Sequence, residues 1–155
     1  MKIRWAEESD IEALILMRWE FTVEDKPETR DEFELFATEC RAFLKEAIHG
    51  GRWLIWVADQ DGLLAAHVYV QLVDKVPRPG RTTYPYGYLT NVYTDPDFRS
   101  RGIGGYLVEA VKQWAKENHI EFLVVWPSKR ARDFYARHGF EPAGEAMELH
   151  PPAGR

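Results

Sequence analysis

Three glycines stand close together in residues 95–105, a turn whose residue types suit the binding of a phosphate group. The segment reads DPDFRSRGIGG and separates an apolar stretch from an amphipathic one. Gly102, Gly104 and Gly105 let backbone N–H groups approach an anion without obstruction by side chains, and the start of a helix adds partial positive charge at the same point. The spacing therefore predicts a cradle for a pyrophosphate.

Two arginines strengthen this interpretation. Arg99 and Arg101 can add positive charge and bidentate hydrogen bonds to a phosphate. The dinucleotide fingerprint G-x-G-x-x-G does not occur in the turn, and no Gly-Lys-Ser/Thr follows it, so neither a Rossmann nor a Walker-type loop explains it. A plain strand-to-helix turn is the remaining alternative for the glycines alone.

A second pattern lies in residues 128–140, which read SKRARDFYARHGF. Together the two segments resemble the GNAT superfamily of acyl-CoA-dependent N-acetyltransferases. The cofactor motif of that family, Arg/Gln-x-x-Gly-x-Gly/Ala, is matched by residues 99–104. Its second motif is a small polar residue followed by a helix ending Phe/Leu-Tyr-x-x-x-Gly-Phe, and residues 128–140 match it. The resemblance covers nearly the whole chain and is most specific between Val92 and Phe140.

The resemblance implies a mixed α/β fold, with a central, mostly antiparallel sheet of six to seven strands flanked by about four helices. It also implies acetyl-CoA as the co-substrate, held through its pyrophosphate and pantetheine, and it implies no metal. The residues that it assigns to the cofactor are Val92, Tyr93, Thr94, Arg99, Ser100, Arg101, Gly102, Ile103, Gly104, Gly105, Ser128, Ala131 and Tyr135.

By the same resemblance, the chain transfers an acetyl group directly to a primary amine of a small molecule or peptide. A backbone N–H near Tyr93 would stabilise the oxyanion. Tyr135 would act as the general acid for the CoA thiolate, since a phenol stays protonated at neutral pH. The alternative for Tyr135 is a packing role in the core. The alternative for the whole chain is a non-catalytic acyl-CoA sensor or regulatory module.

The sequence departs from the family at the general base. Many members carry a glutamate on the fourth or fifth strand, where this chain has Tyr88 and Leu123. Four other carboxylates are candidates for that role or for attracting a cationic amine: Glu24, Asp25, Glu32 and Asp74. Each of them is more typical of a solvated surface charge, because carboxylates usually stay exposed.

Four residues are candidates for acceptor binding: Tyr88, Asn91, Glu24 and Tyr84. Tyr84 belongs to a loop, residues 74–87, that contains several prolines and glycines and also carries Arg78 and Arg81. Aromatic side chains in this loop can stack on a planar substrate, and the arginines can bind a carboxylate, as in an amino acid. A solvated connection between two strands is the alternative.

Cysteine and histidine provide no further chemistry. Cys40 lies in an apolar helical pattern and is interpreted as a small buried hydrophobic residue, which favours direct transfer over a cysteine nucleophile. The five histidines are scattered, without metal-ligand spacing, and we assign them no role.

Bulk composition limits the classes of function. The 155 residues, 45% of them hydrophobic, suffice for one core, and we expect one domain at residues 1–150 with a tail at 151–155. A net charge of −5 argues against nucleic acid and anionic membranes as partners. With one cysteine, no apolar run of spanning length and an acidic N-terminus, we expect a cytoplasmic protein without a signal peptide. The resemblance allows a homodimer.

The apolar periodicity distributes these residues over alternating strands and helices. Expected strands are residues 2–5, 53–58, 63–73, 88–94, 120–126 and 140–149. Expected helices begin at residue 11, run through 33–48, and occupy 102–118 and 128–138. The polar segment 22–29 separates the first two helices. The glycine turn is then a strand-to-helix junction, and Tyr135 lies on a later helix.

Overall fold

A computed structural model of the protein describes residues 1–27 and 32–153. In this part of the chain the helices are α1 (Ile11–Asp25), α2 (Phe33–Gly50), α3 (Ile103–Glu117) and α4 (Arg132–Arg137). The strands are β1 (Lys2–Trp5), β2 (Trp53–Gln60), β3 (Leu63–Val73), β4 (Tyr86–Thr94) and β5 (Leu123–Val124). Short 3-10 helices at Glu8–Asp10, Pro96–Phe98 and Lys129–Ala131 precede α1, α3 and α4.

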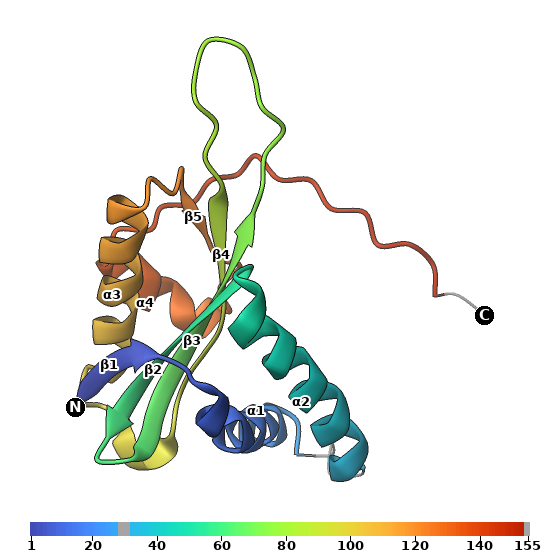
Figure 1. The fold of residues 1–155 in the computed structure, drawn as a ribbon, viewed down its shortest axis with the longest axis vertical. Coiled ribbons are helices and arrows are strands. Elements are labelled where there is room, and N and C mark those ends of the chain that lie inside the picture. Colours follow the sequence, from blue (N-terminus) through green and yellow to red (C-terminus); the bar gives the residue numbers. More distant parts are fainter. Residues whose placement is uncertain (28–31, 154–155) are drawn as a thin grey trace.

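The described strands form one sheet in the order β1-β2-β3-β4-β5 (Figure 1). β1 to β4 are antiparallel neighbours, whereas β5 runs parallel to β4. Only two residue pairs join β4 to β5: Gly87 pairs with Leu123, and Tyr88 pairs with Val124. From Leu89 onward, therefore, no strand of the described residues lies beside β4 on its β5 side.

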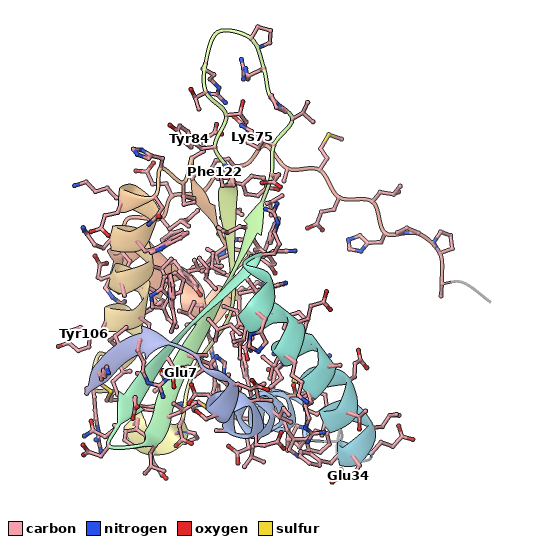
Figure 2. All side chains as sticks on the ribbon, viewed as in Figure 1. Glu7, Glu34, Lys75, Tyr84, Tyr106 and Phe122 are labelled. Atoms are coloured by element: carbon pink, nitrogen blue, oxygen red, sulfur yellow. The ribbon has the colours of Figure 1, made fainter. Side chains whose placement is uncertain are left out.

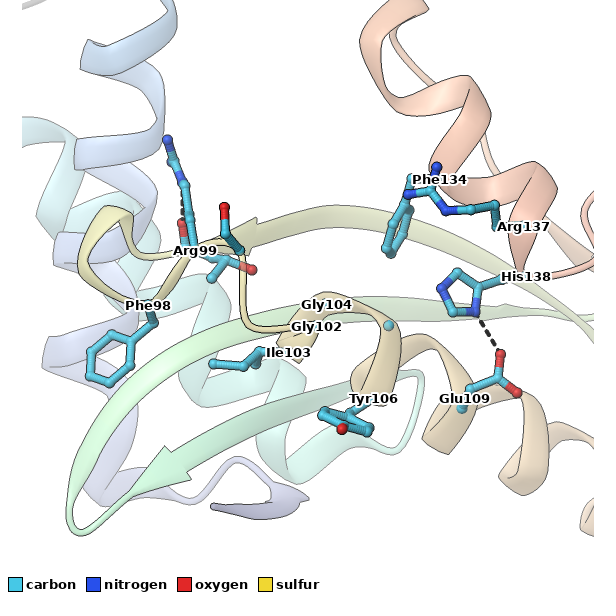
Figure 3. Close-up of a pocket in the computed structure, with 13 residues that line it drawn as sticks. Phe98, Arg99, Gly102, Ile103, Gly104, Tyr106, Glu109, Phe134, Arg137 and His138 are labelled. Atoms are coloured by element: carbon cyan, nitrogen blue, oxygen red, sulfur yellow. Dashed lines mark hydrogen bonds and ion pairs between the residues drawn. The ribbon is translucent and has the colours of Figure 1, made fainter.

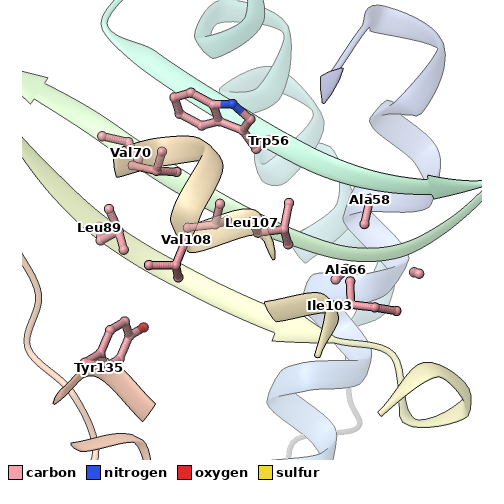
Figure 4. Close-up of a cluster of buried hydrophobic side chains, with 12 residues drawn as sticks. Trp56, Ala58, Ala66, Val70, Leu89, Ile103, Leu107, Val108 and Tyr135 are labelled. Carbon is pink, nitrogen blue, oxygen red and sulfur yellow. The ribbon is translucent and has the colours of Figure 1, made fainter. Parts of the chain in front are cut away.

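Helices cover both faces of the sheet, as Figure 1 shows. α3 and α4 lie over one buried cluster, which includes Val68, Val70 and Leu89 (Figure 4). α1 and α2 lie over another, which includes Val57 and Tyr69. The two sets alternate along β3 because successive side chains of a strand point to opposite faces of the sheet. Each face thus has its own core, and the sheet separates the two.

α3 confirms the prediction for residues 102–118 to within one residue at each end. Its buried positions are Ile103, Leu107, Val108, Val111 and Ala115, a stripe with the spacing of one helix face. Gly102 immediately precedes the helix in a left-handed conformation, with φ of 76°. A residue with a Cβ adopts that conformation at a cost, so glycine at this position fixes where the helix begins.

Two predictions about strands were wrong. The segment 140–149 forms no strand, and the sheet in the described residues has five strands instead of six to seven. The predicted strand 120–126 is reduced to the two residues of β5. A strand needs a neighbour for its backbone hydrogen bonds, and residues 141–153 have none; Pro142 and Gly144, with φ of 54°, also interrupt their start.

The remaining elements follow the sequence closely. The predicted hairpin is β2 and β3, joined by a two-residue turn at Asp61 and Gly62 with φ of 52° and 92°. The predicted helix 128–138 is divided into a 3-10 turn and the shorter α4. The predicted break between the first two helices, residues 22–29, starts later than expected because α1 continues to Asp25. Its last two residues, 28 and 29, lie outside the described residues. None of the described helices has the length and apolarity needed to cross a bilayer.

Candidate functional site

The site is organised by a bulge in β4. His67 pairs with Tyr93 and Tyr69 pairs with Thr90, so three steps along β4 match two steps along β3. The extra residue is accommodated at Asn91, whose φ of 53° is left-handed. As a consequence, Asn91 leaves the regular ladder, and its backbone and side chain become available to other groups.

The buried His67 holds this bulge in place. Its ring nitrogen Nδ1 lies 2.8 Å from the backbone oxygen of Asn91. Burial lowers the pKa of His67 to about 4, so at neutral pH the ring is uncharged. Since the carbonyl only accepts, Nδ1 is the nitrogen that carries the proton. Nε2 is therefore an acceptor, and it is buried without a hydrogen-bond partner among the described residues.

The glycine turn leads from the end of β4 into α3. Ser100 and Gly102 both have left-handed backbones, with φ of 64° and 76°. The first amides of α3 then point out of the helix without partners inside it, which is the arrangement that binds anions at helix N-termini. Beside this turn lies a cavity of about 630 Å³ (Figure 3). We name it the first cavity; it is lined by Thr94, Phe98, Arg99, Ser100, Gly102, Ile103, Gly104, Gly105, Tyr106, Glu109, Phe134, Arg137 and His138.

Gly104 and Gly105 allow α4 to pack closely against α3. A Cβ on Gly105 would lie 3.1 Å from the ring of His138, and one on Gly104 would lie 3.5 Å from the ring of Phe134. The absence of side chains at these two positions therefore lets the two rings form one wall of the first cavity. His138 is further held by Glu109, whose carboxylate lies 2.7 Å from Nδ1.

Arg99 lines the first cavity, but its guanidinium is bound to a carboxylate of α1. Its guanidinium donates two hydrogen bonds to the carboxylate of Glu24, at 2.6 and 2.8 Å, and Nε donates to the backbone oxygen of Thr94 at 3.0 Å. The bond to Arg99 lowers the pKa of Glu24. This bidentate pair ties α1 to the turn, so Glu24 and Arg99 are partners of each other in this structure.

Two other arginines near the first cavity, Arg101 and Arg137, are candidates for binding an anion. The guanidinium of Arg101 lies over the ring of Phe98, 5.4 Å from its centre. Arg137, at the end of α4, lines the cavity itself (Figure 3). No ion pair of either side chain is found in the described part of the chain. Both can therefore bind an anion.

Tyr135 lies inside the core that α4 shares with the sheet. Only 7% of the residue is exposed, and its ring meets the edges of Phe134 and Phe140. Burial raises the pKa of Tyr135 to about 12, so the phenol keeps its proton at neutral pH. Ala131 packs against the same core, whereas Ser128 is exposed and precedes the 3-10 turn. Tyr135 thus packs in the core and keeps its proton, and its role as the general acid stays a prediction.

A second cavity, of about 330 Å³, lies on the other face of the sheet between β3, β4, α1 and α2. It is lined by Arg18, Phe36, Glu39, Cys40, Phe43, Leu44, Trp53, Tyr69, Thr90 and Asn91. The bulge makes the consecutive residues Thr90 and Asn91 both line this cavity, while Thr94 lines the first one. β4 therefore connects the two cavities.

The predicted acceptor residues do not come together. Tyr84 stacks on the ring of His119, at 5.2 Å, and Tyr88 meets the edge of Trp126, at 4.9 Å. The loop 74–85 extends beyond the body of the protein, with Lys75 bound to Glu121 at its base (Figure 2). Of the four predicted acceptor residues, only Asn91 lines the second cavity.

The candidate carboxylate bases are also dispersed. Asp74 pairs with Arg52, Asp25 ends α1, and Glu32 precedes α2 with φ of 64°. Their positions do not bring any of them into the lining of either cavity. In the described residues, no group of three His, Cys, Asp or Glu side chains is arranged to hold a metal ion.

Sequence reasoning missed His67, Arg18 and Arg137. Arg137 lies inside the second sequence motif, so its place at the end of the helix that carries Tyr135 was a usable signal. His67 and Arg18 gave no local signal, because their importance depends on the bulge of β4. Arg18 donates a hydrogen bond of 3.0 Å to the side-chain oxygen of Asn91.

Known structures share this fold. A predicted acetyltransferase of Clostridium acetobutylicum, solved with acetyl-CoA, is 25% identical and superposes with a TM-score of 0.79 over 96% of this chain and 95% of that one. A GCN5-related N-acetyltransferase of Ralstonia eutropha is 25% identical, with a TM-score of 0.75 over 96% of this chain and 97% of that one.

Sequence comparison agrees. An uncharacterised N-acetyltransferase of Methanocaldococcus jannaschii is 27% identical in an alignment of 136 residues that covers 75% of this chain and 58% of that protein. The matched region thus spans little more than half of that relative. The profile of the acetyltransferase (GNAT) family matches residues 11–140, which include the bulge, the glycine turn and Tyr135. The chain belongs to the acetyltransferase (GNAT) family.

Proposed function

We propose that this chain transfers the acetyl group of acetyl-CoA to a primary amine. The observation that carries the proposal is the position of β4, whose bulge borders the second cavity and whose end borders the anion-binding turn of the first. A cofactor and an acceptor can thus occupy opposite faces of the sheet and meet where β4 has parted from β5.

The residues of the first cavity fit the phosphates of CoA. The start of α3 offers backbone N–H groups, and Ser100 and Gly102 have the left-handed backbone that such a cradle needs. Arg101 and Arg137 supply positive charge, whereas Arg99 supports the cradle from behind through Thr94 and Glu24. The Clostridium relative, solved with acetyl-CoA, supports the same ligand here.

The chain itself supplies two chemical functions. Acetyl-CoA, when bound, provides an acetyl thioester whose C–S bond breaks as the C–N bond to the amine forms. We assign the backbone N–H of Tyr93, just after the bulge, as the donor to the acetyl oxygen, because donors aimed at a developing negative charge accelerate acyl transfer. We assign the phenol of Tyr135 as the proton donor to the departing sulfur.

The alternative is a protein that binds acyl-CoA without turnover. It is favoured by the family resemblance described above, which places Tyr88 and Leu123 where many members carry a glutamate on the fourth or fifth strand. No group of β4 or β5 in the described residues replaces that base. The phenol of Tyr135, which a sensor would not need, favours the enzyme.

Calorimetric titration with acetyl-CoA and CoA, followed by thiol release with a mixed panel of primary amines, tests the proposal. We expect binding of both cofactor forms and thiol release that depends on the amine. Binding without release across the panel would establish the sensor instead. Failure of either cofactor form to bind at near-millimolar concentration would refute the assignment of the first cavity.

A further inference from the structure

The second cavity has a wall of aromatic rings. Phe43 of α2 meets Trp53 of β2 edge to face at 5.3 Å, and Trp53 meets Tyr69 of β3 at 6.5 Å. Phe36 and Leu44 extend this wall along α2. Such a surface binds a planar or large apolar group, because aromatic rings bury much area and stack with other rings. The part of a ligand in contact with it is therefore apolar.

The other end of the cavity is polar and lies against the bulge. Thr90, Asn91 and Arg18 meet there, and Arg18 donates to Asn91 Oδ1 at 3.0 Å. A guanidinium has five N–H donors, so this single bond leaves others for a ligand. No carboxylate pairs with Arg18 in the described ranges, in contrast to Arg41 and Arg99, which are held by Glu12 and Glu24. Arg18 is thus a cation ready for an anionic group.

Charge at this end disfavours a polycationic acceptor. Besides Arg18, the titratable groups that line the cavity are Glu39 and Cys40 of α2 and Tyr69 of β3. Burial raises the pKa of both Cys40 and Tyr69, so these two are uncharged at neutral pH. One cation and one exposed carboxylate remain. That balance suits a zwitterion, with one charge of each sign, better than a polyamine or a lysine-rich peptide.

We infer that the acceptor is an α-amino acid with an aromatic or large apolar side chain, an inference that rests on the proposed function. The side chain lies among the rings of the second cavity, the carboxylate binds Arg18, and the amine reaches the bulge at Asn91. A cavity of about 330 Å³ is large enough for one such residue. In the reaction the amine nitrogen bonds to the acetyl carbon, CoA leaves as the thiol, and the surplus proton of the ammonium passes to solvent.

A groove on the far side of α1 is the competing acceptor site. It has a volume of about 440 Å³ and carries four carboxylates, those of Glu20, Glu24, Asp95 and Asp97. Glu24 is already paired with Arg99, and the Asp95 side chain accepts from the amide of Asp97. This groove would select a cation such as spermidine, and a clear preference for spermidine is the result that would favour it.

The test uses pairs of acceptors that differ only in the carboxylate: L-tryptophan with tryptamine, and L-phenylalanine with phenethylamine. Thiol release is measured for the wild type and for Arg18→Gln. A charge-assisted hydrogen bond contributes about 1.5–3 kcal/mol, which is roughly 10- to 100-fold. We expect kcat/KM of the wild type to favour each amino acid over its amine, and Arg18→Gln to remove most of that preference by slowing the amino acids alone.

One control variant and one further test variant separate recognition from other effects. Arg41→Gln makes the same charge change on the neighbouring helix, outside the cavity lining, and should preserve the preference. Phe43→Ala removes a ring that is 40% exposed, so the fold tolerates it. It should raise KM for L-tryptophan and leave KM for L-alanine nearly unchanged.

The outcomes distinguish the two proposals. If thiol is released but the amines or spermidine are preferred, or if Arg18→Gln slows both members of each pair equally, the acceptor class is wrong and acetyl transfer stands. If CoA binds and no amine in the panel releases thiol, the proposed function fails and the acceptor inference fails with it.

Discussion

Tyr135 packs in the core, and we propose that the same side chain also donates a proton in the reaction. Its ring is buried against Phe134 and Phe140. Its hydroxyl makes no hydrogen bond to the described residues, so removing the hydroxyl breaks none of them. The raised pKa, about 12, keeps the phenol protonated at neutral pH, so that its O–H can donate a hydrogen bond to the departing sulfur in the proposed reaction. The two roles can therefore be separated by removing one oxygen atom.

We predict that Tyr135→Phe lowers kcat by about 10²- to 10⁴-fold, the usual contribution of a general acid. The ring remains, so the free energy of unfolding should change by less than about 1 kcal/mol, and CoA affinity should be nearly unchanged. Steady-state kinetics, urea unfolding and calorimetry measure the three quantities. An unchanged kcat would mean that Tyr135 only packs in the core.

His67 is a residue whose burial makes stability depend on pH. Its pKa is about 4 in the folded protein, below the ordinary value of 6.5 that the unfolded chain retains. As the pH falls through 6.5, the unfolded chain therefore binds a proton that the folded protein does not. We predict that the free energy of unfolding falls between about pH 6.5 and pH 4, by about 3 kcal/mol in all.

Urea unfolding at pH 7.5, 6.5, 5.5 and 5 measures this slope, in a range where most carboxylates are still ionised. His67→Gln keeps an N–H group for the carbonyl of Asn91 and does not titrate. It should lose most of the slope. A variant that kept the full pH dependence would show that other groups cause it.

At the scale of elements, a partly buried ion pair joins β1 to the start of α1. Arg4 of β1 donates two hydrogen bonds to Asp10, at 2.8 and 3.0 Å, and one to Asp59 of β2, at 3.1 Å. The Asp10 carboxylate also accepts from the amide of Glu7 at 2.7 Å. Burial by itself would raise the pKa of Asp10, but the bonds from Arg4 lower it overall.

We predict that Arg4→Met destabilises the protein by about 2–4 kcal/mol, because it leaves the Asp10 carboxylate buried without its cation. Arg41→Met is the matched control. Its partner Glu12 is exposed, and an exposed pair contributes about 1 kcal/mol or less. Thermal or urea unfolding of both variants measures the difference. Equal losses in the two variants would contradict the account.

Helices and turns that depend on nearby residues, such as a glycine or an apolar stripe, could be predicted from the sequence. Strands that depend on pairing with a distant strand could not. The start of α3 follows from Gly102 and the stripe behind it, both visible in the sequence. The strand predicted at 140–149 failed because strand formation needs a neighbour, and β5 has only two paired residues.

The residues of the candidate site likewise include some that could be predicted from the sequence and some that could not. The glycine turn could be identified from the spacing of its residues, and it lines the first cavity. Tyr135 could be identified only through the resemblance to the family, and it lies in the core. The direction of Arg99 could not be predicted, because it depends on where α1 places Glu24. The positions of Arg18 and His67 could not be predicted either. Both residues bind Asn91 in the bulge, and the bulge depends on the register of β3 and β4.

For the molecule as a whole, the C-terminal residues contribute little to the packed body. Residues 141–153 form no helix or strand, and all are exposed, including Met147 at 97% and Leu149 at 88%. In Figure 1 they run away from the sheet. Phe140, just before them, packs on Tyr135 and donates its amide hydrogen to the backbone oxygen of Tyr135. The folded body therefore ends at Phe140.

We predict that deleting residues 146–155 changes the melting temperature by less than about 2 °C, since no buried contact is lost. A chain that ends at Gly139 should melt lower by about 5 °C or more, because it also loses the Phe140 ring. Calorimetric melting of the three chains provides the comparison. A large loss on the shorter deletion would mean that the segment packs on the body or on a second copy in solution.

For the proposed reaction, the separation of the two cavities by the sheet has a consequence for the order in which substrates bind and products leave. A molecule bound beside α3 does not cover the opening beside α2, and the reverse also holds. Neither substrate must therefore arrive first, and neither product must leave first. Steady-state kinetics of such an enzyme follow a random sequential scheme through a ternary complex, in which free CoA competes with acetyl-CoA and not with the acceptor.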